Sequence, residues 1–326
     1  MQAPGFWQHG KGGVLAQLLS PLGWVYGFAT KAKLATTIPW KSPVPVLCIS
    51  NLTAGGAGKT PVALDLGKRL IAKGKTVHFL SRGYGGCEKG PLLVDPDVHD
   101  HTSVGDEPLL LSIHAPAWVS RVRRSGCEAA ARAGADLIIM DDGFQNPYIH
   151  KNFSVIVIDG GYGFGNAKMI PAGPLRESIA SGLARADSCV VIGEDTTGTL
   201  DIASSCGLSP LRARFIADAL SDDAPTGPVV AFTGIGRPEK FFETVTQMGH
   251  NVVSTIPFPD HHPYNNADIN TLRQIATKAG AQLLTTEKDA QRLPASFIDD
   301  VTVIPVSLEW TDEGALDALL NGICNA

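Results

Sequence analysis

The chain has 326 residues and a mass of 34.4 kDa, which is longer than a typical single domain and predicts two α/β units or one heavily decorated unit. Its formal charge of −5, and the lack of any basic run longer than Arg123-Arg124, argue against binding to a nucleic-acid backbone. A hydrophobic fraction of 44% and a mean hydropathy of +0.07 exclude a polytopic membrane protein but agree with contact at a bilayer surface.

The first 40 residues differ in composition from the rest of the chain. Residues 13–29 carry no charge, include Trp24 and Tyr26, and are bracketed by Lys11, Lys31 and Lys33. The stretch is short for a membrane-spanning helix, which needs about 20 residues, and it lacks the cleavage site of a secretory signal. We therefore expect residues 1–40 to form an apolar helix at the membrane interface. The alternative is a helix packed on the protein's own core.

From residue 41 to residue 220, short β-branched apolar runs alternate with stretches of helical character. This alternation is typical of βαβ units around a mostly parallel sheet, so we expect an α/β/α domain over 41–220. Strands are expected at 44–50, 76–81, 137–140, 154–158 and 189–192.

A glycine-rich turn follows the first of these strands, in the run VLCISNLTAGGAGKTP at 46–61. Glycines let backbone N–H groups surround phosphate oxygens, a lysine reaches the outer phosphates, and a Ser or Thr hydroxyl contacts magnesium. The pattern predicts a P-loop NTPase-like domain that uses ATP and Mg²⁺, although Thr53 stands where the first glycine is usual. Lys59 is also a candidate catalytic residue and Thr60 a candidate metal ligand. The expected nucleotide-binding residues are Thr53, Ala54, Gly55, Gly56, Ala57, Gly58, Lys59 and Thr60.

Two acidic motifs follow in the same domain. GDEP at 105–108 precedes an apolar helical stretch, and capping of that helix is the default interpretation of Asp106 and Glu107. Asp141 and Asp142 follow the apolar run 137–140, where P-loop enzymes place an acidic residue that holds magnesium or its water shell. We expect both aspartates to serve the metal, with an acidic turn before Gly143 as the alternative.

An acidic segment rich in Pro and Gly, 218–228, marks the expected domain boundary. A second alternation of strands and helices over 228–326 predicts a smaller α/β domain that closes the active-site cleft. Within it, the run VTVIPVSL at 301–308 is expected to be one strand. We also consider a return of the carboxyl-terminal segment toward the linker.

A turn in the second unit holds Asp260, His261 and His262 between Pro259 and Pro263. These residue types suit a metal site, but no further cluster lies nearby to complete a ligand set. A surface turn and a histidine in acid–base chemistry both remain open from the local sequence.

The cysteines are widely spaced and form no C-x-x-C pair, which predicts reduced thiols in a cytosolic protein. The sequence indicates no obligate protein partner. The six cysteines are Cys48, Cys87, Cys127, Cys189, Cys206 and Cys324.

The order and spacing of these motifs resemble the tetraacyldisaccharide 4'-kinase family over about residues 44–293. The matching runs are SNLTAGGAGKTP, SRGYGG, GDEP, DDGFQ, PAGPLRE, FTGIGRPEKF, DHHPY and TTEKDAQRL. The family's phosphate loop has the form T-x-G-G-x-G-K-T, which accounts for Thr53. One position departs from the family's D-D-G-x-Q-H motif, because Asn146 stands where histidine is usual.

The resemblance implies transfer of the ATP γ-phosphate to the 4'-hydroxyl of a glycolipid, tetraacyldisaccharide 1-phosphate, to form lipid IVA in lipid A biosynthesis. It also implies a peripheral position on the cytoplasmic face of the bacterial inner membrane. In this family Asp106 is the candidate base, and His261, with Tyr264, is its partner across the interdomain cleft. Residues implied to lie near the substrate or nucleotide are Glu107, Gln145, Arg176 and Glu177.

Two other functions share the nucleotide motifs. A P-loop kinase of a soluble small molecule would have no use for an apolar amino terminus. A membrane-associated switch-type ATPase would not need GDEP or DHHPY, and it would hydrolyse ATP without an acceptor.

Overall fold

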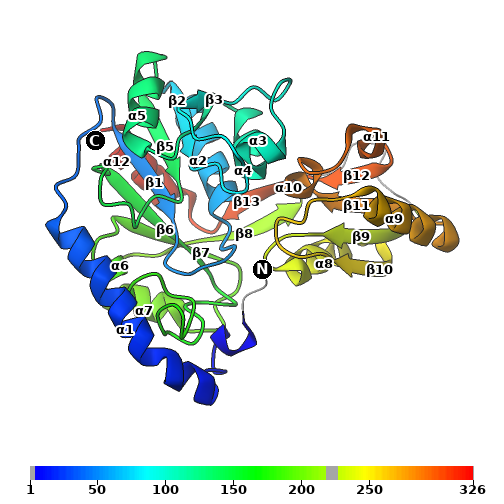
Figure 1. Ribbon diagram of the computed structural model, residues 1–326, viewed down its shortest axis with the longest axis horizontal. Helices are drawn as coiled ribbons and strands as arrows, with labels where there is room; N and C mark the ends of the chain where they lie inside the picture. The colour runs from blue at the N-terminus through cyan, green and yellow to red at the C-terminus, as the bar shows by residue number, and fades with distance from the viewer. Residues whose placement is uncertain (1–3, 218–226, 326) are drawn as a thin grey trace.

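Two sheets organise the chain, a 9-stranded sheet and a 4-stranded sheet. The computed structural model describes residues 4–217 and 227–325, so most of the predicted linker at 218–228 lies outside the described residues. Figure 1 shows the larger sheet and its helices on the left and the smaller unit on the right. The predicted α/β class, with a larger and a smaller unit, is confirmed.

The strands of the large sheet are β1 (Val46–Ser50), β2 (Val77–Ser81), β3 (Leu92–Leu93), β4 (Ala117–Val119), β5 (Leu137–Asp141), β6 (Phe153–Asp159), β7 (Ser188–Ile192), β8 (Leu211–Ala217) and β13 (Val306–Trp310). They lie in the order β13-β8-β7-β6-β1-β5-β2-β4-β3. The edge strands β13 and β3 are antiparallel to their neighbours, and the strands between them are parallel. The parallel strands therefore bring the loops that follow β1, β5 and β6 to one edge of the sheet.

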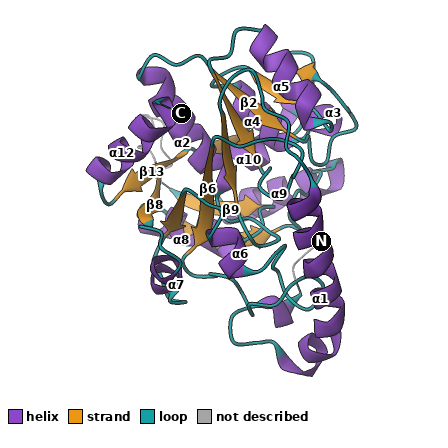
Figure 2. Cartoon of the chain, turned by 90° about the vertical axis from the view of Figure 1, so that its left-hand side faces the viewer, coloured by secondary structure: helices purple, strands orange, loops and turns teal. Residues whose placement is uncertain are grey.

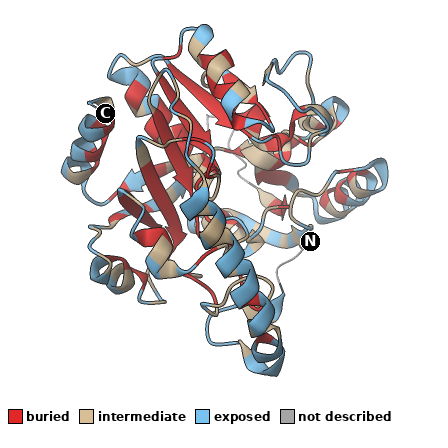
Figure 3. Cartoon of the chain, turned by 60° about the vertical axis from the view of Figure 1, so that its left-hand side comes forward, coloured by how far each residue is buried: buried red, intermediate tan, exposed pale blue. Residues whose placement is uncertain are grey.

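Helices cover both faces of this sheet (Figure 2). They are α2 (Lys59–Ala72), α4 (Asp106–Ser112) and α12 (Glu313–Cys324) on one face, and α5 (Arg123–Arg132), α6 (Ile179–Leu183) and α7 (Thr199–Ser205) on the other; α3 (His101–Val104) precedes α4. Leu47 and Ile49 of β1 pack toward the first layer and Val46 and Cys48 toward the second. Burial on both faces explains why the strand is a continuous apolar run, and Figure 3 shows the central strands as buried.

The smaller unit is a parallel sheet in the order β10-β9-β11-β12 with its own aromatic core. Phe232 of β9 contacts the rings of Phe258, Tyr264 and Phe297 in that core. The elements are β9 (Pro228–Thr233), α8 (Pro238–Gln247), β10 (Asn251–Pro257), α9 (Asn266–Ala279), β11 (Gln282–Thr286), α10 (Glu287–Ala290), α11 (Ala295–Ile298) and β12 (Val301–Ile304).

The carboxyl terminus returns to the large sheet. β13 pairs antiparallel with β8, with Leu308 opposite Phe215, and α12 packs on α2. The run expected as one strand at 301–308 is therefore two strands in different sheets, separated at Pro305, which has no N–H to donate to a ladder. The predicted range 228–326 for the smaller domain is wrong at its carboxyl end for the same reason.

The amino-terminal helix, α1 (Gly13–Thr36), extends beyond the uncharged stretch at 13–29. It lies against the large unit through small residues: a Cβ on Gly23 would be 2.8 Å from Met169 O, and Gly27 also faces the Met169 side chain. Its large apolar side chains are exposed instead, as the pale colour of the helix in Figure 3 shows. They are Val14, Leu15, Leu18, Leu22, Trp24, Val25 and Phe28. Among residues 4–217 and 227–325, no helix is long and apolar enough to span a bilayer.

Candidate active site

The glycine-rich turn 51–58 joins β1 directly to the amino terminus of α2. Gly58 has φ 86°, a left-handed conformation that favours glycine, and a Cβ there would lie 2.9 Å from both Ile192 Cδ1 and Phe215 Cζ. The turn thus leaves backbone N–H groups at the start of a helix, an arrangement that binds phosphate. That residues 53–60 bind the nucleotide stays a prediction.

Asn51 supports this turn from within, a role that the sequence analysis did not assign. Its Nδ2 donates to Gly55 O at 3.2 Å, and its Oδ1 lies 3.4 Å from Lys59 Nζ. Lys59 Nζ is also 3.9 Å from Asp142 Oδ2. The Lys59 ammonium is therefore held at the mouth of the loop between an amide and a carboxylate.

Asp141 and Thr60 form the candidate magnesium site. The Thr60 hydroxyl donates to Asp141 Oδ2 at 3.0 Å, while Asp141 Oδ1 is buried and has no hydrogen-bond partner among the residues that the structure describes. Burial, and then the nearby charge of Glu107, raise the pKa of Asp141 to about 7. A hydroxyl beside an unsatisfied buried carboxylate oxygen fits a cation that prefers oxygen ligands.

The described residues contain no cluster of three or more His, Cys, Asp or Glu side chains suited to a metal. Mg²⁺ is usually held by one or two carboxylates together with nucleotide phosphates and water.

Asp142 is the charged neighbour of that site. It has φ 53°, and its Oδ1 accepts from Arg176 Nη1 at 2.6 Å and from Ser50 Oγ at 3.0 Å. Burial opposes ionisation, but Lys59 and Arg176 outweigh it and lower the pKa of Asp142. The structure thus joins the predicted metal-side residue Asp142 to the predicted substrate residue Arg176.

Gln145 and Glu177 lie beside this group. Gln145 Nε2 donates to Asn51 O at 3.2 Å and to Glu177 Oε1 at 3.1 Å, and Glu177 forms a 2.6 Å ion pair with Arg185. Glu177 is therefore already paired within the protein. Asn146, at the position where the family usually has histidine, caps its own turn by accepting from Tyr148 N at 2.8 Å.

Asp106 and His261 meet across the two units, although 155 positions separate them. His261 Nδ1 lies 2.9 Å from Asp106 Oδ2 and 3.1 Å from Oδ1, and Arg292 Nε is 3.3 Å from Oδ2. Asp106 is 3% exposed. Burial opposes its ionisation, but the His261 hydrogen bond and Lys288 lower the pKa of Asp106 to about 2. Asp106 is the first residue of α4, after the N-cap Gly105, and its Oδ1 also accepts from Glu107 N at 2.9 Å, so the predicted first-turn role exists beside the contact with His261.

The other residues of the histidine turn have separate partners. His262 Nε2 lies 2.9 Å from Asp268 Oδ2, so the two adjacent histidines do not share a ligand site. Tyr264, expected beside His261, is buried, and its hydroxyl donates to Asp289 Oδ1 at 2.7 Å. Its side chain supports the small-domain core.

The segment TTEKDAQRL supplies two cations that the sequence analysis did not assign. Lys288 Nζ donates to Glu107 Oε1 at 3.0 Å and lies 3.3 Å from His261 Nε2, while Arg292 reaches Asp106. The only sequence signal was the presence of this segment among the family motifs.

A second contact between the units involves the start of α8. A Cβ on Gly236 would lie 3.3 Å from Gly56 N, so the FTGIGRPEKF segment rests on the phosphate loop. Next to it, Arg237 and Lys240 both form ion pairs with Asp159 at the end of β6.

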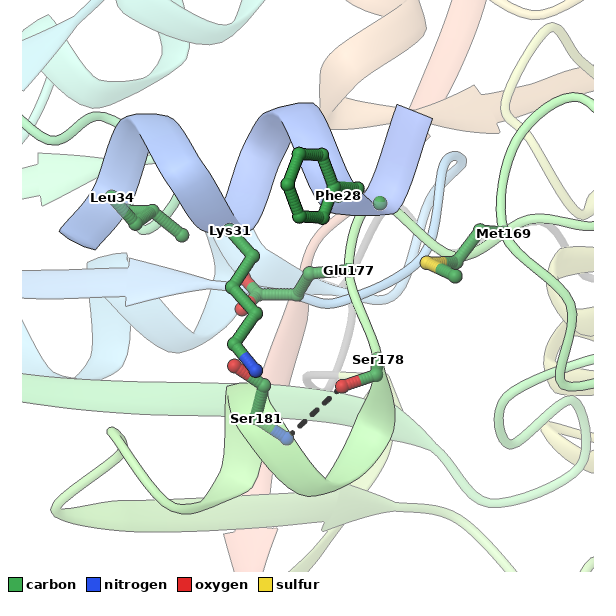
Figure 4. Close-up of a pocket in the computed structure, with 8 residues that line it drawn as sticks. Phe28, Lys31, Leu34, Met169, Glu177, Ser178 and Ser181 are labelled. Atoms are coloured by element: carbon green, nitrogen blue, oxygen red, sulfur yellow. Dashed lines mark hydrogen bonds between the residues drawn. The ribbon is translucent and has the colours of Figure 1, made fainter. Parts of the chain in front are cut away.

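A pocket of about 190 Å³ lies between α1 and the segment 169–181 (Figure 4). In Figure 4, Lys31 extends from α1 toward Ser181, while Phe28 and Met169 give the pocket an apolar side. The pocket is lined by Gly27, Phe28, Lys31, Leu34, Met169, Glu177, Ser178 and Ser181. It therefore connects the exposed helix with the chain that carries Arg176.

Comparison with known proteins gives consistent results. The sequence model of the family described as LpxK, tetraacyldisaccharide-1-P 4'-kinase, matches residues 15–325. The tetraacyldisaccharide 4'-kinases of Rhodospirillum centenum and Paramagnetospirillum magneticum are each 49% identical to this chain, over 98% and 99% of it and 96% and 99% of their own lengths. The crystal structure of the "apo" form of LpxK from Aquifex aeolicus in complex with ATP matches with a TM-score of 0.75 at 25% identity, covering 95% of this chain and 99% of that one.

Proposed function

The chain belongs to the tetraacyldisaccharide-1-P 4'-kinase family, and from this membership we propose that it transfers the ATP γ-phosphate to the 4'-hydroxyl of tetraacyldisaccharide 1-phosphate. The product is lipid IVA, an intermediate of lipid A biosynthesis. The enzyme is an ATP-dependent kinase that uses Mg²⁺. The observation that carries the proposal is the 2.9 Å contact between Asp106 and His261, because a kinase must activate an acceptor hydroxyl.

At the nucleotide, residues 53–60 surround the phosphates through backbone N–H groups, and Lys59 neutralises charge on the group being transferred. Thr60 and Asp141 would hold the magnesium ion, which neutralises phosphate charge when bound. Asp142 forms ion pairs with both Lys59 and Arg176, so it brings two cations together beside the phosphate loop.

At the acceptor, the Asp106 carboxylate takes the proton of the 4'-hydroxyl as that oxygen bonds to the γ-phosphorus, while the bond between the γ-phosphorus and the bridging oxygen breaks and ADP leaves. A pKa of about 2 keeps Asp106 ionised at neutral pH but makes it a weak base. His261 compensates by orienting the carboxylate and sharing its charge through the Nδ1 hydrogen bond. Arg176 contacts phosphate or substrate, while Glu107, Gln145 and Glu177 hold their neighbours in place.

We further propose that the enzyme works as a peripheral protein on the cytoplasmic face of the bacterial inner membrane. The support is α1, whose small residues pack inward and whose large apolar residues are exposed, the reverse of a helix that serves the protein's own core. The pocket between α1 and the segment 169–181 has an apolar side and one cation, Lys31, while its carboxylate, Glu177, is already paired with Arg185. Such a lining suits a phosphorylated glycolipid that remains partly in the bilayer.

The test is acceptor-dependent phosphate transfer. Purified protein is incubated with γ-labelled ATP and Mg²⁺, with and without tetraacyldisaccharide 1-phosphate in detergent micelles. Label should appear in the glycolipid at the 4' position, and phosphate release without acceptor should be small. Acceptor-independent hydrolysis with no labelled lipid would instead indicate a switch-type ATPase, and transfer to a soluble sugar alone would indicate a small-molecule kinase.

A further inference from the structure

Lys288 lies behind the proposed base pair, on the side of His261 that faces away from Asp106. It comes from α10 in the small unit, and its Nζ is 3.3 Å from His261 Nε2 and 3.0 Å from Glu107 Oε1. The imidazole therefore has a carboxylate at Nδ1 and an ammonium at Nε2.

The two contacts together specify where the imidazole proton lies. A lysine ammonium donates hydrogen bonds and cannot accept them. His261 Nε2 must therefore be the acceptor toward Lys288, which leaves the ring proton on Nδ1, where it can be donated to Asp106. In the opposite tautomer, two N–H groups would face each other at Nε2, and two lone-pair groups would face each other at Nδ1.

We propose that Lys288 is a positioning residue that holds His261 in the neutral Nδ1–H tautomer, so that His261 donates to Asp106 rather than taking a proton from it. This inference rests on the proposed function of the Asp106–His261 pair and adds a third member. It also gives the segment TTEKDAQRL a role, because this segment places the Lys288 ammonium at the interface, where it contacts Glu107 of the large unit and His261.

The surrounding charges keep Lys288 protonated. Burial disfavours its charge, but Glu107 and Asp106 outweigh burial and raise the pKa of Lys288 above its usual range. The groups that face His261 are Asp106 from α4, Lys288 from α10, Asp260 Oδ1 at 3.9 Å from Nε2, and the Tyr84 ring at 5.3 Å. Among these, Lys288 is the donor that Nε2 can accept from.

The alternative to a tautomer-setting role for Lys288 is a purely structural one. Lys288 bonds Glu107 across the interface, so it could act only as a tie between the two units. A tie would be weakened as much by Glu107→Gln as by Lys288→Met, and both variants would raise the KM values. A tautomer-setting role predicts that Lys288→Met lowers kcat and leaves the KM for ATP within about 3-fold, since the lost interaction acts on the chemical step.

The first measurement reads the tautomer directly in the full-length protein. With ¹⁵N-histidine labelling, the His261 signals are identified by their loss in His261→Gln. We expect a protonated Nδ1 and an unprotonated Nε2 near pH 7.5, and in Lys288→Met a shift toward protonated Nε2. A protonated Nε2 in the wild-type protein, or an unchanged His261 spectrum in Lys288→Met, would overturn the proposal.

The second measurement is kinetic and uses Lys278→Met as the matched control, because Lys278 is an exposed lysine of the same unit. Lys288→Met should lower kcat by about 10-fold or more, up to the roughly 10²–10⁴-fold contribution of general base catalysis. Because Lys288 lowers the pKa of Asp106, its loss should also move the acid limb of the pH–rate profile to higher pH. Lys288→Arg, which keeps the charge and the donors, should recover part of the rate, and Lys278→Met should match wild type. Circular dichroism and thermal melts confirm that each variant is folded.

The variant Asp106→Asn distinguishes a failure of the Lys288 proposal from a failure of the proposed function. If Asp106→Asn is severely impaired while Lys288→Met turns over normally, the lysine inference fails and the proposed function stands. If Asp106→Asn also turns over normally, the base pair and the lysine inference fail together.

Discussion

Asp141 combines full burial with one unsatisfied carboxylate oxygen. Burial, and then the nearby charge of Glu107, disfavour the ionised carboxylate, so the folded protein binds a proton there more tightly than the unfolded chain does. The pKa of about 7 lies above the usual 3.8 of an aspartic acid, so this group's contribution to stability is fully present below about pH 4 and is lost as the pH rises through 7.

We therefore expect Asp141→Asn to stabilise the nucleotide-free protein at pH 8, where the wild type carries the buried charge. The gain should be roughly 2 °C or more in Tm at pH 8 and smaller at pH 5.5, and Mg²⁺-dependent activity should be lost. Differential scanning fluorimetry at both pH values checks this. Equal Tm values for variant and wild type at pH 8 would show that burying the ionised Asp141 carboxylate does not destabilise the folded protein.

Lys59 is held by Asn51 and Asp142 at the mouth of the phosphate loop. Lys59→Ala should abolish phosphate transfer, because the lysine neutralises charge on the γ-phosphoryl group as it leaves ADP. Transfer is measured with labelled ATP and glycolipid, with Lys68→Ala on the same helix as a control for the removal of a lysine. Turnover near the wild-type rate in Lys59→Ala would rule out the assigned role of the loop.

The roles of the two acidic motifs could be predicted from the sequence to different extents. Asp141 and Asp142 follow a strand beside the phosphate loop, so local order was sufficient to predict their place. Asp106 gave only a capping signal by itself, because its partners His261, Lys288 and Arg292 come from the other unit. Tyr264 was paired with His261 by motif, yet its hydroxyl bonds Asp289 inside the small core.

Among the helices, α1 packs on the protein through small residues and exposes its large apolar side chains. Ala16 and Gly23 face the protein, and Leu18 and Phe28 are 71% and 75% exposed. Because exposed side chains contribute little to folding, charges placed there should leave stability unchanged.

The variant Leu18→Glu/Phe28→Glu should therefore bind vesicles of anionic phospholipid less than the wild type does, while soluble-ATP binding stays the same. Vesicle co-sedimentation measures the bound fraction. Val98→Glu is the matched control, since Val98 is 74% exposed and lies in the segment between β3 and α3. If the double variant and Val98→Glu sediment alike, α1 is not the membrane-binding surface.

The element that could not be predicted from local sequence is the division of residues 301–310. The run VTVIPVSL is apolar throughout, and periodicity alone does not reveal that β12 joins the small sheet and β13 the large one. Pro305 was a visible interruption, but the partner of β13 is β8, almost 100 residues earlier, and that pairing depends on the tertiary fold. The parallel strands β1, β2, β5, β6 and β7 were predictable because burial on both faces makes each a continuous apolar run.

At the scale of the whole molecule, two sets of ion pairs hold the units together. Asp106 and Glu107 meet His261, Lys288 and Arg292 at one side, and Asp159 meets Arg237 and Lys240 at the other. The order of motifs predicted two units around a cleft, but not which residues would join them.

Asp159→Asn should weaken closure of the small unit without touching the Asp106–His261 contact. Hydrogen bonds to charged groups contribute about 1.5–3 kcal/mol, so the closure equilibrium should shift by about 10-fold or more, with a higher KM for ATP. Small-angle scattering should give a larger radius of gyration for Asp159→Asn than for wild type. The control is Asp201→Asn, because Asp201 is an exposed aspartate of the large unit, to which Asp159 also belongs. If both variants give identical scattering and KM values, closure depends on the contacts of Asp106 and Glu107 with the small unit and not on Asp159.

Asp106 and His261, one from each unit, are proposed to act as a single group on the acceptor hydroxyl. A double-mutant cycle on kcat for glycolipid phosphorylation, with Asp106→Ala, His261→Ala and the double variant, tests it most directly. Each single variant should lose about 10²–10⁴-fold, and the double variant should be little worse than the more impaired single one, because residues that act as a unit are strongly non-additive. Losses that multiply in the double variant, or a single Asp106→Ala that turns over at the wild-type rate, would contradict the account.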